Sequence, residues 1–226
     1  MRPLTRYALL LVISAACGRD AGQAASDSTV AGPGITIRRT REVDLTGDRR
    51  PERFIALATG SRYDSLEVTL EIRSPEDSLL YVDSWDSGLY FQYDDRSQLT
   101  DSAVEHRVRA QVDSLLGNAA FRPGGDELTT DERMSREGMR DAIRDDVAEE
   151  MWRQANRIPV DSSTPSGAEA AIHAIAQDSV SDARVESLVA ELRDRPTFRY
   201  FAGGEANYAI AWSEEERRFV TVWACC

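Results

Sequence analysis

The chain has 226 residues and a formal net charge of −12, from 39 acidic residues and 27 basic residues when histidine is not counted. All 27 of those basic residues are arginines, which excludes chemistry that needs a lysine, such as Schiff-base formation or a phosphate-binding loop with its lysine. An acidic chain is a poor partner for nucleic acid. His106 and His173 match no metal-ligand spacing, and no catalytic set of residues is predicted.

The first seventeen residues have the three regions of a secretory leader. Arg2 and Arg6 provide the positive region, residues 7–13 are apolar, and the small residues 14–16 stand directly before Cys17. The pattern resembles a bacterial lipoprotein signal. The resemblance implies cleavage after residue 16, lipidation of Cys17 and attachment to the cell envelope. The alternative is an ordinary secretory leader with an incidental cysteine.

Residues 17–34 contain the candidate lipidated cysteine followed by a small, polar and aperiodic segment. Such a segment buries too little apolar surface to fold and is predicted to be a flexible tether that reaches roughly 20–25 Å. Gly18 follows the cysteine where an inner-membrane protein often has aspartate. We therefore expect a lipid anchor in the outer membrane, a domain facing the periplasm or cell surface, and an envelope protein or polymer as partner.

Residues 35–226 are predicted to form one α+β domain that begins with strands. Segment 65–74 alternates apolar and polar side chains without a fault, which predicts a half-buried strand. Residues 54–58 are all apolar, which favours a strand covered on both faces. Further strands are predicted over 35–45 and 78–85, the latter continuing through 89–93 past a kink at Gly88.

Between about residues 100 and 195 the spacing of apolar residues becomes helical. Thr100 can cap a first helix, and Thr129 with Glu132 resembles a capping box for a second that ends before Pro159. Two shorter helices follow, the last beginning at Ser181. Residues 208–212 and 219–224 then form a hairpin in which Trp212 and Trp223 are expected to face each other. The fold prediction is one antiparallel sheet, a four-helix insertion packed on one side, and a closing C-terminal hairpin.

The loop 44–52 has oxygen donors at spacings that suit a hard cation. Positions 1, 3, 5 and 9 offer side-chain oxygens and position 7 offers its carbonyl; these are Asp44, Thr46, Asp48, Glu52 and Arg50. The loop resembles the calcium loop of FG-GAP and VCBS-type repeats, although Arg49 replaces the turn glycine. The resemblance implies calcium as the one candidate cofactor. The alternative is a turn that keeps this shape without metal.

Two other groups are candidate sites. Trp85, Tyr90, Phe91 and Tyr93 could line a small ligand-binding groove, or simply pack. Cys225 and Cys226 are a candidate redox pair, because a disulfide between neighbours about 3.8 Å apart would be strained and easily reduced. The alternative is that they merely end the last strand.

The acidic helix over 141–150 has two interpretations. Its carboxylates could perform acid–base or metal chemistry, or they could form a solvated face opposite the apolar stripe, which we favour. The function predicted from the sequence is a non-catalytic binding or scaffolding module of the envelope. The alternative is a hydrolase of envelope polymers that uses carboxylates with calcium assistance.

Overall fold

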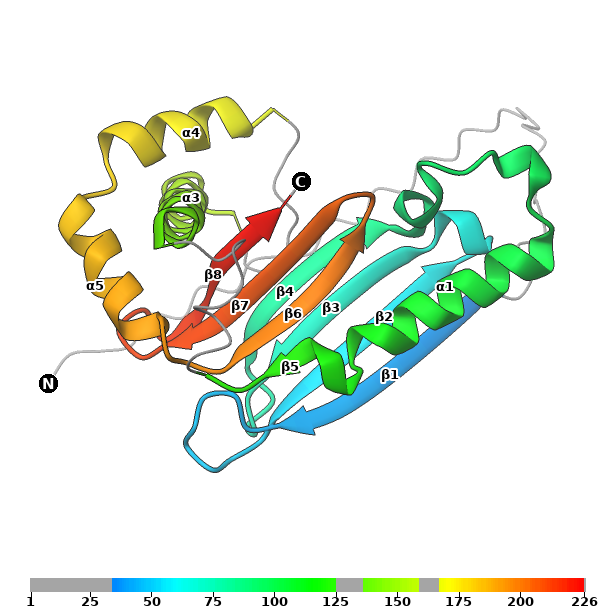
Figure 1. The fold of residues 1–226 in the computed structure, drawn as a ribbon, viewed down its shortest axis with the longest axis horizontal. Coiled ribbons are helices and arrows are strands. Elements are labelled where there is room, and N and C mark those ends of the chain that lie inside the picture. The colour runs from blue at the N-terminus through cyan, green and yellow to red at the C-terminus, as the bar shows by residue number, and fades with distance from the viewer. Residues whose placement is uncertain (1–33, 125–135, 159–166, 226) are drawn as a thin grey trace, which may run out of the picture. The chain divides into compact units, whose positions relative to one another are not determined.

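The strands of the chain form two antiparallel sheets of four strands each (Figure 1). The computed structural model describes residues 34–124, 136–158 and 167–225. The first sheet contains, in spatial order, β1 (Ile35–Val43), β2 (Glu52–Gly60), β3 (Glu67–Arg73) and β4 (Leu79–Asp86). The second contains β5 (Phe121–Arg122), β6 (Thr197–Gly203), β7 (Ala206–Ser213) and β8 (Arg218–Cys225).

The described helices are α1 (Asp101–Leu115), α3 (Arg136–Asn156), α4 (Glu169–Asp178) and α5 (Asp182–Leu192). The cap predicted at Thr100 and the helix start predicted at Ser181 are both confirmed. The Thr100 hydroxyl accepts from the Ala103 amide at 3.2 Å, and the Ser181 hydroxyl accepts from the Arg184 amide at 3.3 Å. Thr129, Glu132 and Pro159 lie outside the described residues. No helix in the described segments is long and apolar enough to cross a membrane.

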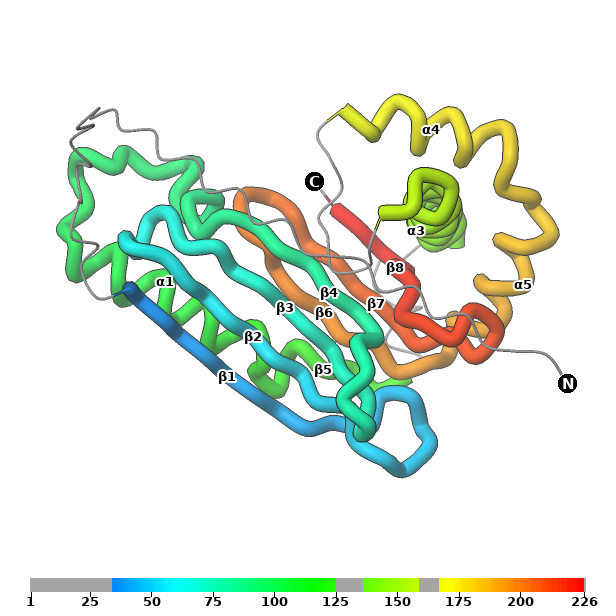
Figure 2. Tube along the Cα trace, turned by 180° about the vertical axis from the view of Figure 1, so that it is seen from behind, coloured from blue at the N-terminus to red at the C-terminus, as the bar shows by residue number. Residues whose placement is uncertain are grey.

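A main core lies between the two sheets and α1. The alternation predicted for residues 65–74 is confirmed, because Val68, Leu70 and Ile72 of β3 are fully buried on one face. Phe54 of β2 meets Phe198 of β6 with ring centroids 5.0 Å apart, which joins the two sheets. Seen from behind, the opposite face of the first sheet has no described helix over it (Figure 2).

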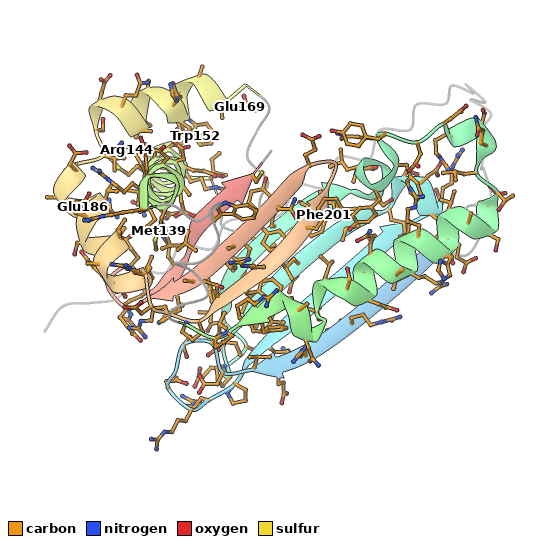
Figure 3. The ribbon with its side chains drawn as sticks, in the orientation of Figure 1. Met139, Arg144, Trp152, Glu169, Glu186 and Phe201 are labelled. Atoms are coloured by element: carbon orange, nitrogen blue, oxygen red, sulfur yellow. The ribbon has the colours of Figure 1, made fainter. Side chains whose placement is uncertain are left out.

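A second core fills the space between the other face of the second sheet and the helices α3 and α5. Buried residues of β7 and β8 meet Ile143 and Val147 of α3 and Leu188 of α5 there. Ion pairs tie the helices together on their outer side, including Arg140 Nε to Glu186 Oε1 at 2.8 Å, in the region shown in Figure 3. The second sheet is therefore covered on both faces, by the first sheet and by helices.

The α+β class and the C-terminal hairpin are confirmed, but the strands form two sheets where one was expected. Residues 87–91 form a 3₁₀ helix instead of extending β4, because the Asp86 carboxylate accepts from the Gly88 amide at 2.6 Å and turns the chain. β6 was not predicted, and it makes the hairpin part of a longer meander. Trp212 and Trp223 do not face each other: Trp212 packs on the main core and Trp223 on the second.

Candidate functional site

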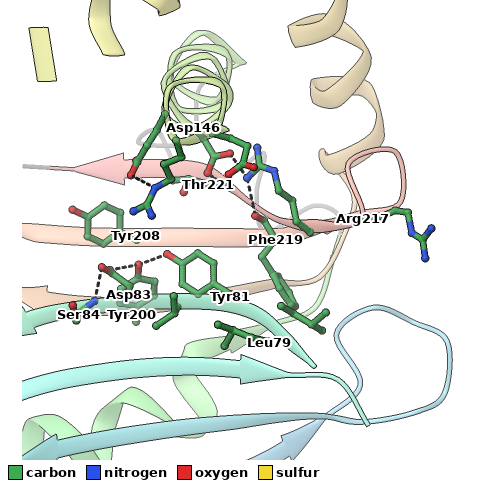
Figure 4. A pocket seen from close by; sticks show the side chains of 16 residues that line it. Leu79, Tyr81, Asp83, Ser84, Asp146, Tyr200, Tyr208, Arg217, Phe219 and Thr221 are labelled. Atoms are coloured by element: carbon green, nitrogen blue, oxygen red, sulfur yellow. Dashed lines mark hydrogen bonds and ion pairs between the residues drawn. The ribbon is translucent and has the colours of Figure 1, made fainter. Parts of the chain in front are cut away.

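A cavity of about 550 Å³ opens between the free edge of β4, the tyrosines of the second sheet and α3 (Figure 4). Its β4 wall is the continuous run Leu79–Ser84. The opposite wall comes from about two turns of α3, Asp146 to Arg153, together with β8. Cavities of this size are typical of small-ligand sites, and this one is lined by both aromatic and charged side chains.

A chain of hydrogen bonds crosses the aromatic wall. Tyr81 and Asp83 stand two residues apart on β4 and so point to the same face of the sheet. The Tyr200 hydroxyl donates to Asp83 Oδ2 at 2.7 Å and lies 2.6 Å from the Tyr81 hydroxyl. Since Tyr200 uses its one proton on Asp83, Tyr81 must donate to Tyr200. Tyr208 stacks on Tyr200 with ring centroids 5.2 Å apart. This contact holds the Tyr200 ring in the position from which its hydroxyl bonds Asp83 and Tyr81.

Burial controls the protonation of these groups. Removal from water raises the pKa of the Asp83 carboxyl, although the hydrogen bond from Tyr200 works against that rise. Burial also raises the pKa of Tyr81 and Tyr200 well above the ordinary range of a phenol, so both remain neutral donors. The aromatic wall therefore presents a single carboxyl whose charge is costly to keep in the absence of a cation.

We expect Asp83→Asn to raise the melting temperature by a few degrees at pH 7. A carboxyl whose pKa is raised in the folded state lowers the stability as the pH rises through that pKa, and asparagine removes this cost. The Oδ1 atom of asparagine can still accept from the Ser84 amide while its Nδ2 donates to the Tyr200 oxygen. The difference should shrink as the pH falls below the ordinary aspartate pKa of 3.8. Calorimetric melting of both proteins between pH 3 and 8 measures it; a variant less stable than the parent at pH 7 would contradict this reading.

The helical wall carries a buried ion pair. Asp146 Oδ2 lies 2.6 Å from Arg218 Nη1, and the Asp146 side chain is only 12% exposed. Its other oxygen accepts from the backbone amide of Thr221 at 2.9 Å, so α3 covers the outer edge of β8. The solvated face predicted for residues 141–150 is therefore wrong at Asp146, although Asp141 and Asp145 are exposed.

The remaining charges of the helical wall have different partners. Arg153 Nε donates to Glu149 Oε1 at 3.1 Å, and Gln154 Nε2 donates to Glu150 Oε1 at 2.8 Å. Arg217 points away from the cavity (Figure 4). The Nε and Nη2 atoms of Arg218 are buried and have no hydrogen-bond partner among the described atoms.

The predicted metal loop leads into the start of β2 and shares no residue with the lining of the cavity. Asp44, Asp48 and Glu52 each offer a carboxylate oxygen, and these oxygens lie within 4.8 Å of one another, so the triad could hold a metal ion. The loop also closes on itself: Glu52 is 1% exposed and accepts from the Leu45 amide at 2.7 Å and from the Thr46 hydroxyl at 2.8 Å. The Arg50 side chain pairs with Glu76, outside the triad.

None of the four aromatic residues predicted to line a groove lines the cavity. Trp85, Tyr90 and Phe91 are in the main core, where the Trp85 indole donates to the Tyr90 hydroxyl at 2.9 Å and stacks on Tyr200. Tyr93 is 70% exposed. Cys225 is exposed at the end of β8, whereas Cys226 and the candidate lipidation site Cys17 lie outside the described residues.

Sequence reasoning missed the tyrosines and Asp83 of the cavity. Asp83 could have been found from its position in the 78–85 strand. It pairs with Leu70, which is fully buried, and an aspartate on a buried face of a sheet is unusual. No protein-family model, no curated protein and no solved structure matches this chain.

Proposed function

We propose that this protein is a non-catalytic binding module held at the cell envelope by a lipid on Cys17, with its ligand in the cavity between β4 and α3. The observation that carries the proposal is that cavity of about 550 Å³, whose polar groups are already fixed by hydrogen bonds. The leader and tether supply the placement, since they resemble those of a bacterial lipoprotein.

Anchoring is tested through Cys17. We expect mass spectrometry to find a lipidated amino-terminal cysteine, and Cys17→Ser to move the protein out of the membrane fraction. An uncleaved leader with an unmodified cysteine in the cytosolic fraction would overturn this part of the proposal.

Ligand binding is tested by crosslinking capture from envelope extracts. Glu150→Arg reverses a charge in the cavity wall, and Asp141→Arg makes the same change at an exposed position of the same helix. We expect the parent and Asp141→Arg to retain one captured component that Glu150→Arg loses at least tenfold. Equal capture by all three proteins would place binding elsewhere.

A hydrolase of envelope polysaccharide is the second candidate function. The observation favouring it is that Asp83, with its raised pKa, and the carboxylates Asp146 and Glu149 line one cavity. Burial raises the pKa of both Asp83 and Asp146, and hydrolysis of glycosidic bonds uses a pair of carboxyl groups that flank the bond. Release of reducing ends from purified cell-wall polysaccharide, abolished by Asp83→Asn, would support it; no release by the parent protein would remove it.

The acidic triad supports a further proposal, that the Asp44–Glu52 loop binds calcium. Carboxylates from three positions and the Arg50 carbonyl are hard donors of the kind that calcium prefers. We expect titration calorimetry at millimolar calcium to give heat that Asp48→Ala abolishes and Asp113→Ala, a matched change on α1, preserves. No heat with the parent protein would end this proposal.

A further inference from the structure

Two sheet edges border the cavity, and within the described segments only the edge of β8 is covered by another element. β8 is the edge of the second sheet, and α3 covers it through the bond from the Thr221 amide to Asp146. β4 is the edge of the first sheet and pairs with β3 alone. Six consecutive residues of β4, Leu79–Ser84, line the cavity. Because neighbouring side chains of a strand point to opposite faces, a continuous run can line one cavity only if the main chain itself forms the wall.

We propose that an extended peptide segment pairs with the free edge of β4 and places a basic side chain in the cavity. This inference rests on the proposed function and names the class of its ligand. An unpaired strand edge offers a row of amides and carbonyls to a partner strand, which gives affinity, while pockets beside it select side chains. Six strand residues span roughly 20 Å, so a peptide of about six residues matches the lined edge.

The charge of the cavity favours a cation. Two of its arginines already have carboxylate partners, Arg218 with Asp146 and Arg153 with Glu149. Asp83 and Glu150 have no ion pair to any arginine among the described residues, so two carboxyls are left for a ligand. A lysine or arginine side chain of the ligand would meet Asp83 and the tyrosine rings beside it, which attract cations. The ligand would then add a positive charge next to buried Asp83, on which Arg153 already acts at longer range.

The test is a selection from a random library of displayed linear heptapeptides against the full-length mature protein in detergent. Glu150→Arg serves for counter-selection and Asp141→Arg as the matched control. We expect enriched peptides to contain one lysine or arginine within a β-branched stretch. Replacing that basic residue by norleucine, or N-methylating the alternate amides that face β4, should weaken binding at least tenfold, whereas methylating the other amides should not.

Three outcomes would overturn the peptide inference: no enrichment over the Glu150→Arg protein, enriched peptides without a basic residue, or binding insensitive to N-methylation. Titration with cell-wall oligosaccharides separates this failure from failure of the proposed function. Oligosaccharide binding that Glu150→Arg abolishes, without peptide binding, leaves the cavity as the site and makes the ligand a glycan. Concentration-dependent dimers blocked by Glu150→Arg would make the partner a second copy. Envelope capture unchanged by Glu150→Arg would overturn the proposed function itself.

Discussion

Asp146→Ala is expected to lower the free energy of unfolding by about 3–5 kcal/mol, the loss typical of removing one partner from a buried ion pair. The Arg218 guanidinium would keep its charge in a site where two of its nitrogens already lack hydrogen-bond partners. The Thr221 amide would lose its acceptor at the same time, which exposes the edge of β8. Urea unfolding at pH 7, followed by tryptophan fluorescence, measures the loss.

Two controls separate the charge from the packing. Asp141→Ala removes an exposed carboxylate from the same helix and should change stability by no more than about 0.5 kcal/mol. The double variant Asp146→Leu with Arg218→Met replaces the pair by apolar side chains and should recover most of the loss, because neither charge is then buried alone. A loss below about 1 kcal/mol for Asp146→Ala would mean that water reaches the guanidinium and that α3 does not depend on this contact.

The features of the fold that the sequence predicts are those set by neighbouring residues. The alternation in β3 depends only on side-chain period, and the caps at Thr100 and Ser181 depend on hydroxyls three residues from the amides they bind. The helical insertion was recognised for the same reason. Each of these features can be located without knowing what the segment packs against.

The cavity depends on contacts between distant parts of the chain, which no local pattern reports. Tyr200 bonds Asp83 across 117 positions, and the Thr221 amide bonds Asp146 across 75. The amino-acid composition of β6 also does not indicate which of the two sheets it joins. The pairing of an unpredicted strand with the C-terminal hairpin brought Tyr200 and Tyr208 opposite β4 and so created the aromatic wall.

Asp146 differs from the other residues of the cavity, because its burial could have been predicted from its spacing to the apolar residues of α3. It stands three residues after Ile143 and one before Val147, and Glu150 follows at seven from Ile143, so both acidic side chains flank the buried stripe of α3. Asp141 and Asp145 are exposed. The prediction of one solvated face was wrong because it grouped acidic residues that lie on two different sides of the helix.

Glu52→Ala is the second substitution expected to be severe, with a loss of about 3–4 kcal/mol. Hydrogen bonds to a charged group contribute about 1.5–3 kcal/mol each, and a buried donor left without its acceptor adds a penalty. The Glu52 carboxylate accepts from the Leu45 amide, the Thr46 amide at 3.3 Å and the Thr46 hydroxyl, all in buried surroundings. It thereby joins the start of β2 to the chain leaving β1.

The same substitution decides what holds the Asp44–Glu52 loop together. If the carboxylate acts through its hydrogen bonds, Glu52→Ala should be destabilised equally in calcium-free and calcium-containing buffer, and Asp48→Ala, at an exposed position, should cost less than about 1 kcal/mol. If a bound cation closes the loop instead, a chelator should lower the melting temperature of the parent protein and have no effect on Glu52→Ala. The buried position of Glu52 favours the first outcome, because its carboxylate already accepts from the Leu45 amide and the Thr46 hydroxyl.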